Sequence, residues 1–204
     1  MQFTYKEIIA ILLSIYEIDQ PNMLAFRGRM QHMQRMGFPP GVNTGRGRPS
    51  CYAWRELFLL GLAFEYLEIG STPERSVLEI MKFENQLLDG LASVILHDQQ
   101  PSDANQSRHL LYVELSALSA LKTNPEQRSN CSIFSPSEIF TAFSGQSNSK
   151  LSSPYSIVDL RQFFSIFVDQ VSKTLEMPRA DTLENVVSWA TDMTQTNRDI
   201  PVAI

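Results

Sequence analysis

Apolar residues recur at helical spacing through the first 90 positions, and this pattern predicts four helices. The first lies within Phe3 to Ile15, and the second begins near Asp19 or Asn22 and ends at Gly37. The second helix has a predicted buried stripe, formed by Met23, Phe26, Met30 and Met33. Its other side presents donors at Arg27, Gln31, Gln34 and Arg35, because residues four, seven and eight positions apart lie on one side of a helix.

Two further helices are predicted after a loop. One runs from about Ala53 to Ile69, where Gly70 ends it, and its buried stripe is Leu57, Leu60, Phe64 and Leu67. The next begins at Thr72 and Pro73, because proline fits the first position of a helix, and it continues through the apolar positions Val77, Ile80, Met81, Leu87 and Leu88.

The pattern changes after Gly90 to short apolar runs separated by polar segments. These runs predict four strands, at Ala92 to Leu96, Leu110 to Leu115, Cys131 to Phe134 and Tyr155 to Val158. A capping box at Ser135 and Glu138 predicts a short helix ending at Phe143. A last long helix is predicted from Asp159, with the stripe Leu160, Phe164, Phe167, Val171 and Leu175, and one short helix is expected around Leu183 to Ala190.

Positive charge is concentrated in the N-terminal quarter of an acidic chain. The segment from Pro21 to Arg55 contains six arginines, no lysine and no acidic residue, whereas the whole chain of 204 residues has a net charge of -5. Such a local excess of arginine is typical of a surface that meets phosphate. The alternative is a solvated basic face without a partner, and the segregation of the charge favours contact with DNA.

The string GVNTGRGRPS, residues 41 to 50, contains three glycines and an Asn-Thr-Gly turn signal, which predict a tight hairpin or loop with Arg46 and Arg48 at its tip. A helix that exposes Arg and Gln, followed closely by such a hairpin, is the layout of a winged helix-turn-helix. The helix fits the major groove, where Arg bonds guanine and Gln bonds adenine, and the hairpin arginines reach phosphates or the minor groove.

At these residues the sequence resembles the DNA-binding domain of the MerR family, over about residues 4 to 89. The resemblance lies in the order Met30-Gln31-His32-Met33, Gly37-Phe38-Pro39-Pro40, Thr44-Gly45-Arg46-Gly47-Arg48, Tyr52 and Glu56-Leu57. Where the family has Arg-Tyr-Tyr, this chain has Gln31, His32 and Met33. Taken together, the exposed helix face, the hairpin and the resemblance predict DNA contacts from Arg27, Arg29, Gln31, His32, Gln34, Arg35, Asn43, Thr44, Arg46, Arg48, Tyr52 and Arg55.

The predicted fold class is mainly α with β. It comprises a winged helix-turn-helix domain at residues 1 to 89, a small α+β domain at 91 to 177 and a tail at 178 to 204. The function expected from this organisation is a sequence-specific transcriptional regulator that binds double-stranded DNA as a homodimer. The α+β domain would dimerise or bind a small-molecule or protein effector, and the Leu160 to Leu175 stripe is one candidate dimer surface.

Two other functions remain open from the sequence. The chain could be a protein-interaction adaptor of phage or plasmid type, whose basic surface binds an acidic protein. It could also be an architectural or recombination-directionality factor that bends DNA at adjacent sites. Footprint length would separate the regulator from the architectural factor, and weak, sequence-independent DNA binding together with capture of a defined protein would indicate the adaptor.

The sequence lacks the motifs that would indicate an enzyme, a metal site or a membrane protein. No phosphate-binding loop, paired-histidine motif or nucleophile elbow occurs, so the chain is not expected to be an enzyme and no cofactor is predicted. Cys51 and Cys131 lack partners at ligand spacing, so no metal is predicted, and Cys51 is expected to be at least half-buried. The longest apolar runs are too short to span a bilayer and the N-terminus is unlike a secretory signal, so a cytoplasmic location without membrane contact is expected.

Overall fold

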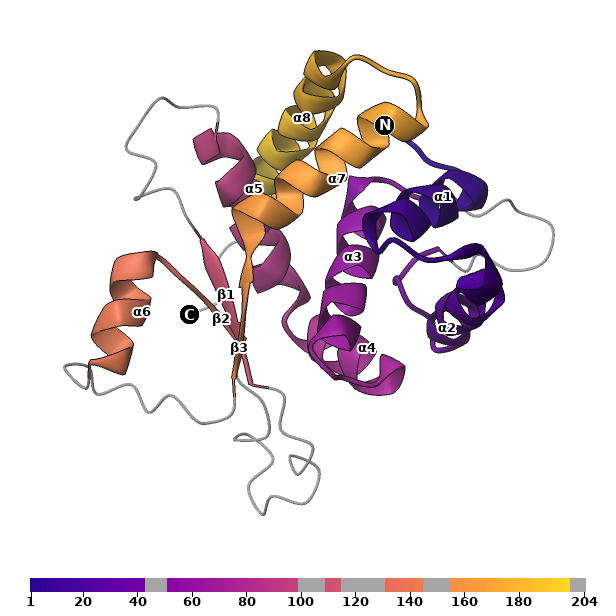
Figure 1. The fold of residues 1–204 in the computed structure, drawn as a ribbon. Coiled ribbons are helices and arrows are strands. Elements are labelled where there is room, and N and C mark those ends of the chain that lie inside the picture. Colours follow the sequence, from indigo (N-terminus) through magenta and orange to yellow (C-terminus); the bar gives the residue numbers. More distant parts are fainter. Residues whose placement is uncertain (43–50, 99–108, 115–130, 145–154, 199–204) are drawn as a thin grey trace.

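The chain is mainly helical with one small antiparallel sheet, so the predicted fold class of mainly α with β is confirmed (Figure 1). The computed structural model describes residues 1–42, 51–98, 109–114, 131–144 and 155–198. Its first helices are α1 (Tyr5–Ile15), α2 (Met23–Arg35), α3 (Trp54–Glu68), α4 (Pro73–Lys82) and α5 (Glu84–Asp98), with a 3-10 turn at Gln20–Asn22. The later helices are α6 (Pro136–Phe143), α7 (Leu160–Thr174) and α8 (Arg179–Arg198).

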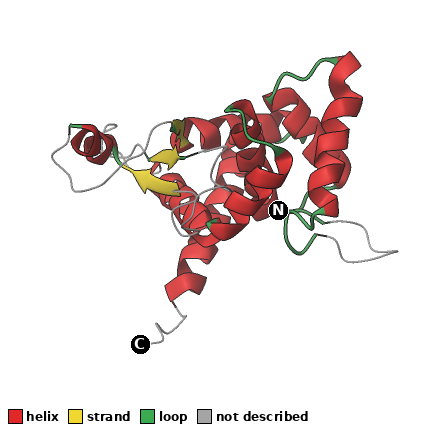
Figure 2. Cartoon of the chain, turned by 90° about the horizontal axis from the view of Figure 1, so that it is seen from below, coloured by secondary structure: helices red, strands yellow, loops and turns green. Residues whose placement is uncertain are grey.

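The sheet has three strands in the order β2-β1-β3, namely β1 (Leu110–Val113), β2 (Cys131–Phe134) and β3 (Ser156–Asp159). The central strand β1 is antiparallel to both neighbours, and Leu111 stands opposite Ile133 on one side and Val158 on the other. The sheet and α6 lie at one end of the molecule, and the other helices make up the rest (Figure 2). These three strands confirm three of the four predicted strand positions.

Side-chain caps begin several helices where the sequence predicted them. The Thr72 hydroxyl accepts a hydrogen bond from the Arg75 amide ahead of α4, and Ser135 with Glu138 forms the predicted capping box of α6. The Asp159 carboxylate accepts from the amides of Arg161 and Gln162 at the start of α7. Each cap satisfies amide groups that have no partner within the helix, which fixes the helix start locally.

Helix α3 is buried on nearly all sides and lies at the centre of the helical core. Helix α7 packs against α1, α5 and α8, and its Phe163 and Phe167 lie against Gly61 of α3. Phe58 of α3 contacts the rings of Phe163, Phe167 and Trp189. The predicted α7 stripe is therefore used inside the chain: Leu160, Phe164, Phe167 and Val171 are buried and are not available as a dimer surface.

Helix α5 corrects the prediction of a strand at Ala92 to Leu96. The run is helical, because Ala92, Val94 and Ile95 are buried on more than one side of α5, and a short apolar run does not distinguish a buried helix from a buried strand. The predicted domain boundary at Gly90 falls inside α5, and buried residues from both sides of it form one core. The fourth predicted helix is divided at Phe83 into α4 and α5.

Helix α8 is longer than the short helix predicted at Leu183 to Ala190. It spans Arg179–Arg198 and packs on α5 and α7. Its buried positions Thr182, Val186 and Ala190 recur every four residues but are small or polar, which made the hydrophobic pattern weak. None of the described helices is both long and apolar enough to cross a membrane.

Candidate nucleic-acid interface

One side of α2 is fixed to the core by its predicted stripe. The ring of Phe26 stacks on Phe64 of α3, with centroids 4.5 Å apart and planes 14° apart. Met30 and Met33 are fully buried, and Met23 is half-buried. Because this side of the helix is held by aromatic and apolar packing, the direction of the opposite side is determined by the fold.

The opposite side of α2 is exposed and carries arginine and glutamine without a carboxylate. The exposed residues of α2 are Leu24, Ala25, Arg27, Gly28, Arg29, Gln31 and Arg35. At about 100° of rotation per residue, Gly28 is at the centre of this side and lies almost directly opposite the buried stripe. Arg27 and Arg29 precede and follow Gly28, about 100° of helix rotation to either side of it.

Gln34 and Tyr52 are not on the exposed side, although both are predicted DNA contacts. The Gln34 side-chain amide donates to the Tyr52 hydroxyl at 2.7 Å. Tyr52 is fully buried, and its backbone pairs with Phe3 through two hydrogen bonds of 2.7 and 3.1 Å. These two residues therefore connect the end of α2 to the N-terminal segment.

His32 faces α4, next to the exposed side. Its Nε2 lies 2.5 Å from Oε1 of Glu74, which is in the first turn of α4. The pKa of the Glu74 carboxyl is lowered, first by a hydrogen bond from its own backbone amide and then by His32. This pair holds α2 against α4 and occupies the imidazole that was predicted to contact DNA.

Arg55 is half-buried in a cluster with two carboxylates. Its guanidinium donates to the Pro40 carbonyl at 3.2 Å, to Glu56 at 2.7 Å and to Glu84. Burial alone lowers the pKa of Arg55, but the hydrogen bonds and charges of Glu56 and Glu84 outweigh burial and raise it. Arg55 thus joins the segment after α2 to α3 and α5, where phosphate would have to compete with two carboxylates.

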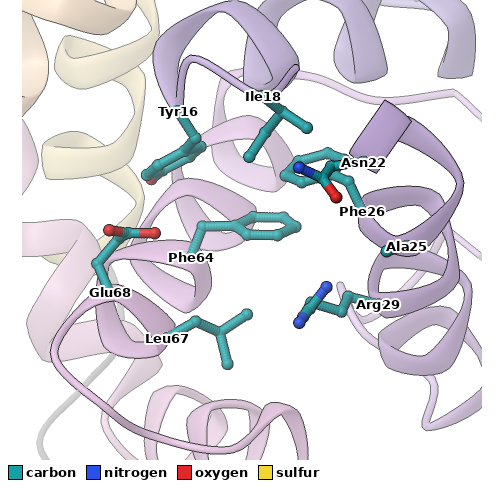
Figure 3. Close-up of a pocket in the computed structure, with 9 residues that line it drawn as sticks. All are labelled: Tyr16, Ile18, Asn22, Ala25, Phe26, Arg29, Phe64, Leu67 and Glu68. Carbon is teal, nitrogen blue, oxygen red and sulfur yellow. The ribbon is translucent and has the colours of Figure 1, made fainter. Parts of the chain in front are cut away.

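Arg29 lines a pocket of about 380 Å³ between the end of α1, α2 and α3 (Figure 3). Phe64 lies in its middle, and Glu68 lies on the side opposite Arg29 (Figure 3). The Tyr16 hydroxyl, at the top of this view, donates to the Gly61 carbonyl at 2.9 Å and to Glu65 at 3.1 Å. Arg29 therefore has a surrounding distinct from that of Arg27, Gln31 and Arg35.

The predicted wing contacts Asn43, Thr44, Arg46 and Arg48 lie outside the described residues. Val42 and Tyr52, which flank this stretch in the sequence, are buried in the core. Cys51 is exposed, which corrects the expectation of a half-buried thiol.

Leu24 and Gly28 belong to the exposed side, but the sequence pattern did not lead to their prediction as part of it. Leu24 is 80% exposed and lies one turn before Gly28. Choosing donor residues alone grouped Arg27, Gln31, Gln34 and Arg35 on one face and left out Leu24 and Gly28. Measuring rotation from the buried Phe26, Met30 and Met33 would have placed it at Gly28.

Within the described ranges, no three His, Cys, Asp or Glu side chains gather in a group that could hold a metal ion.

The exposed side of α2 offers guanidinium and amide donors, whose chemistry suits anionic phosphate and the edges of bases. No protein-family model matches the chain, and no curated protein matches it either.

Proposed function

We propose that the chain is a sequence-specific DNA-binding transcriptional regulator that places α2 in the major groove. The observation that supports this most is the exposed side of α2, which carries Arg27, Gln31 and Arg35 with no acidic residue in the helix. Its other side is held by Phe26, Met30 and Met33, so the donors are presented on a rigid element.

Each donor has a role that follows from its position. Gln31 and Arg35 are near the centre of the exposed side and would bond base edges, where Gln pairs with adenine and Arg with guanine. Arg27 and Arg29 are on its edges and would contact phosphates on the two walls of the groove. Gln34, Tyr52 and Arg55 would position this surface, since each is bonded within the chain.

The MerR-like arrangement is part of the proposal. Helices α1 and α2 form the proposed helix-turn-helix and α3 with α4 supports it, in the order that the resemblance implies. Arg46 and Arg48 would form the wing. Neutralising both should reduce the steepness of the salt dependence of DNA binding by about two units on log-log axes, close to one per lost phosphate contact.

A homodimer in the cytoplasm and a small-molecule or protein effector on the second half of the chain also belong to this proposal. Because the α7 stripe is buried within the chain, the dimer would use another surface. Sedimentation of the full chain with and without a DNA duplex measures the number of copies. Two copies per duplex are expected, and one copy would remove the homodimer from the proposal.

The proposed function is tested by selecting duplexes from a randomised pool with the full chain. A regulator should enrich one short sequence, and the enriched duplex should bind at least about a thousandfold more tightly than the starting pool. Failure to enrich any sequence would contradict the proposal and favour the adaptor. Enrichment of bendable sequence with an extended footprint over adjacent sites would instead favour the architectural factor.

A further inference from the structure

Gly28 is the one glycine in the described part of the chain that the fold itself does not explain. Of the six described glycines, Gly37, Gly41 and Gly70 have positive φ angles, which favour glycine. A Cβ at Gly61 would collide with Phe167, and a Cβ at Gly90 would collide with Ile133. At Gly28 a Cβ would meet no described atom within 4 Å, and the residue has ordinary helical geometry.

A glycine in the interior of a helix destabilises it relative to alanine, because the unfolded chain has more freedom to lose. Gly28 is the sixth of the 13 residues of α2, far from both ends, so it caps neither. The space next to it is open solvent within the described structure. Nothing among the described residues accounts for the missing side chain, whereas a molecule bound at this surface would account for it.

We propose that Gly28 is the point at which α2 approaches a DNA duplex most closely, with Leu24 one turn before it contacting a thymine methyl group. This inference rests on the proposed function. A helix with its side chains is about 10–12 Å across and the major groove is about 12 Å wide, so a position without a side chain lets the backbone lie deeper in the groove.

The charges around Gly28 favour a duplex over a second copy of this chain. Arg27 and Arg29 lie about 100° of rotation to either side of it, where each would meet one phosphate wall of a groove, and Arg29 also lines the pocket beside Phe64. Two copies that met at Gly28 would bring these arginines, and Arg35, toward those of the partner without a carboxylate from α2 to neutralise them. Leu24 adds an exposed apolar contact, which suits the methyl group of thymine.

The test substitutes Gly28 and measures folding and binding separately, using the duplex that the wild-type chain enriches from a randomised pool. Gly28→Ala should raise the Tm by about 2 °C, because alanine favours the helix. Gly28→Met should also fold. It should bind the enriched duplex at least about tenfold more weakly, because the added side chain holds α2 away from the base edges that its neighbours contact. The matched control is Ser188→Met, at an exposed position of α8, which should bind as the wild type does.

The outcomes separate the inference from the function. Unchanged binding by Gly28→Met, or a lower Tm for Gly28→Ala, would overturn the role of Gly28 while leaving the regulator standing. If the wild-type chain enriches no duplex, the proposed function fails and the inference fails with it. In a repeated selection, the Leu24→Ala variant should no longer prefer thymine at one position of the duplex. The control variant Leu78→Ala, which changes another exposed leucine, should keep that preference.

Discussion

Phe26 of α2 stacks on Phe64 of α3, with ring centroids 4.5 Å apart, and this contact sets the rotation of α2 about its own axis. Tyr16 extends the cluster, since its ring centroid lies 5.4 Å from that of Phe64. Both phenylalanines are almost fully buried. The side of α2 that faces solvent is therefore a consequence of aromatic packing on its other side.

The first prediction concerns this aromatic contact. Phe26→Ala should lower the free energy of unfolding by about 3 to 5 kcal/mol, because it removes a buried ring and leaves a cavity, whereas Phe26→Leu should cost less than about 1.5 kcal/mol. Urea denaturation followed by circular dichroism measures both. Phe140→Ala is the control, because Phe140 is 75% exposed, and a loss as large as that of Phe26→Ala would contradict this account.

The second prediction concerns the Arg55 cluster. Arg55→Met should lower the free energy of unfolding by about 1 to 3 kcal/mol, because Glu56 and Glu84 then face each other half-buried without their shared cation. Adding Glu84→Gln should recover part of the loss. Arg179→Met removes the exposed pair with Asp169 and should cost at most about 1 kcal/mol. Equal losses at Arg55 and Arg179, measured by urea denaturation, would show that Arg55 is not structural.

Local signals in the sequence were sufficient for most of the secondary structure. Thr72, Ser135 and Asp159 cap their helices with side chains that bond residues two or three positions away, so the relevant partners are visible in the sequence. Ala92 to Leu96 was misassigned because α8 and α7, which bury it, come 60 or more positions later. Its helical state depends on contacts that local propensity does not contain.

In the candidate site, too, the features set by neighbouring residues were predictable and those set by distant residues were not. The buried stripe of α2 predicted which side faces outward, since helical rotation is a local property. The roles of Gln34 and Arg55 depend on Tyr52 and Glu84, which are 18 and 29 positions away. Residue type alone made both side chains look like DNA contacts. Gly28 is visible in the sequence as a glycine within a helix. Only the structure shows that packing explains Gly61 and Gly90 but does not explain Gly28.

The third prediction is a pH dependence from Glu65. Burial raises the pKa of this carboxyl above its ordinary value, so the unfolded chain ionises Glu65 at lower pH than the folded chain. Stability from this group is present below the ordinary pKa and falls as pH rises through the raised one. Glu65→Gln, which still offers an acceptor to Tyr16, should be more stable than the wild type near neutral pH.

Thermal unfolding across the acidic to neutral range measures this effect. The advantage of Glu65→Gln should shrink as pH falls toward the ordinary range of a glutamate. Glu184→Gln, at an exposed position of α8, removes the same charge and corrects for the change in net charge. An advantage that does not vary with pH would refute the assigned cause.

The fourth prediction distinguishes the two thiols. Burial raises the pKa of Cys131 to about 11, only partly offset by the hydrogen bond from the Tyr66 hydroxyl, whereas Cys51 is exposed. At a pH near 8, a thiol reagent should modify Cys51 in the folded chain and both cysteines in urea, because it reacts with accessible thiolate. Peptide mass mapping identifies the sites. Equally fast modification of Cys131 in the folded chain would contradict its burial.

The central claim is that the exposed side of α2 contacts DNA. Its most direct measurement is the salt dependence of binding to the enriched duplex, for the wild type, for Arg27→Ala with Arg35→Ala, and for Arg179→Ala on α8. Because Arg27 is proposed to contact phosphate and Arg35 a base edge, the double variant should bind more weakly and have a log-log slope shallower by about one unit. Arg179→Ala should keep the wild-type slope. A double variant with the affinity and slope of the wild type would contradict the claim.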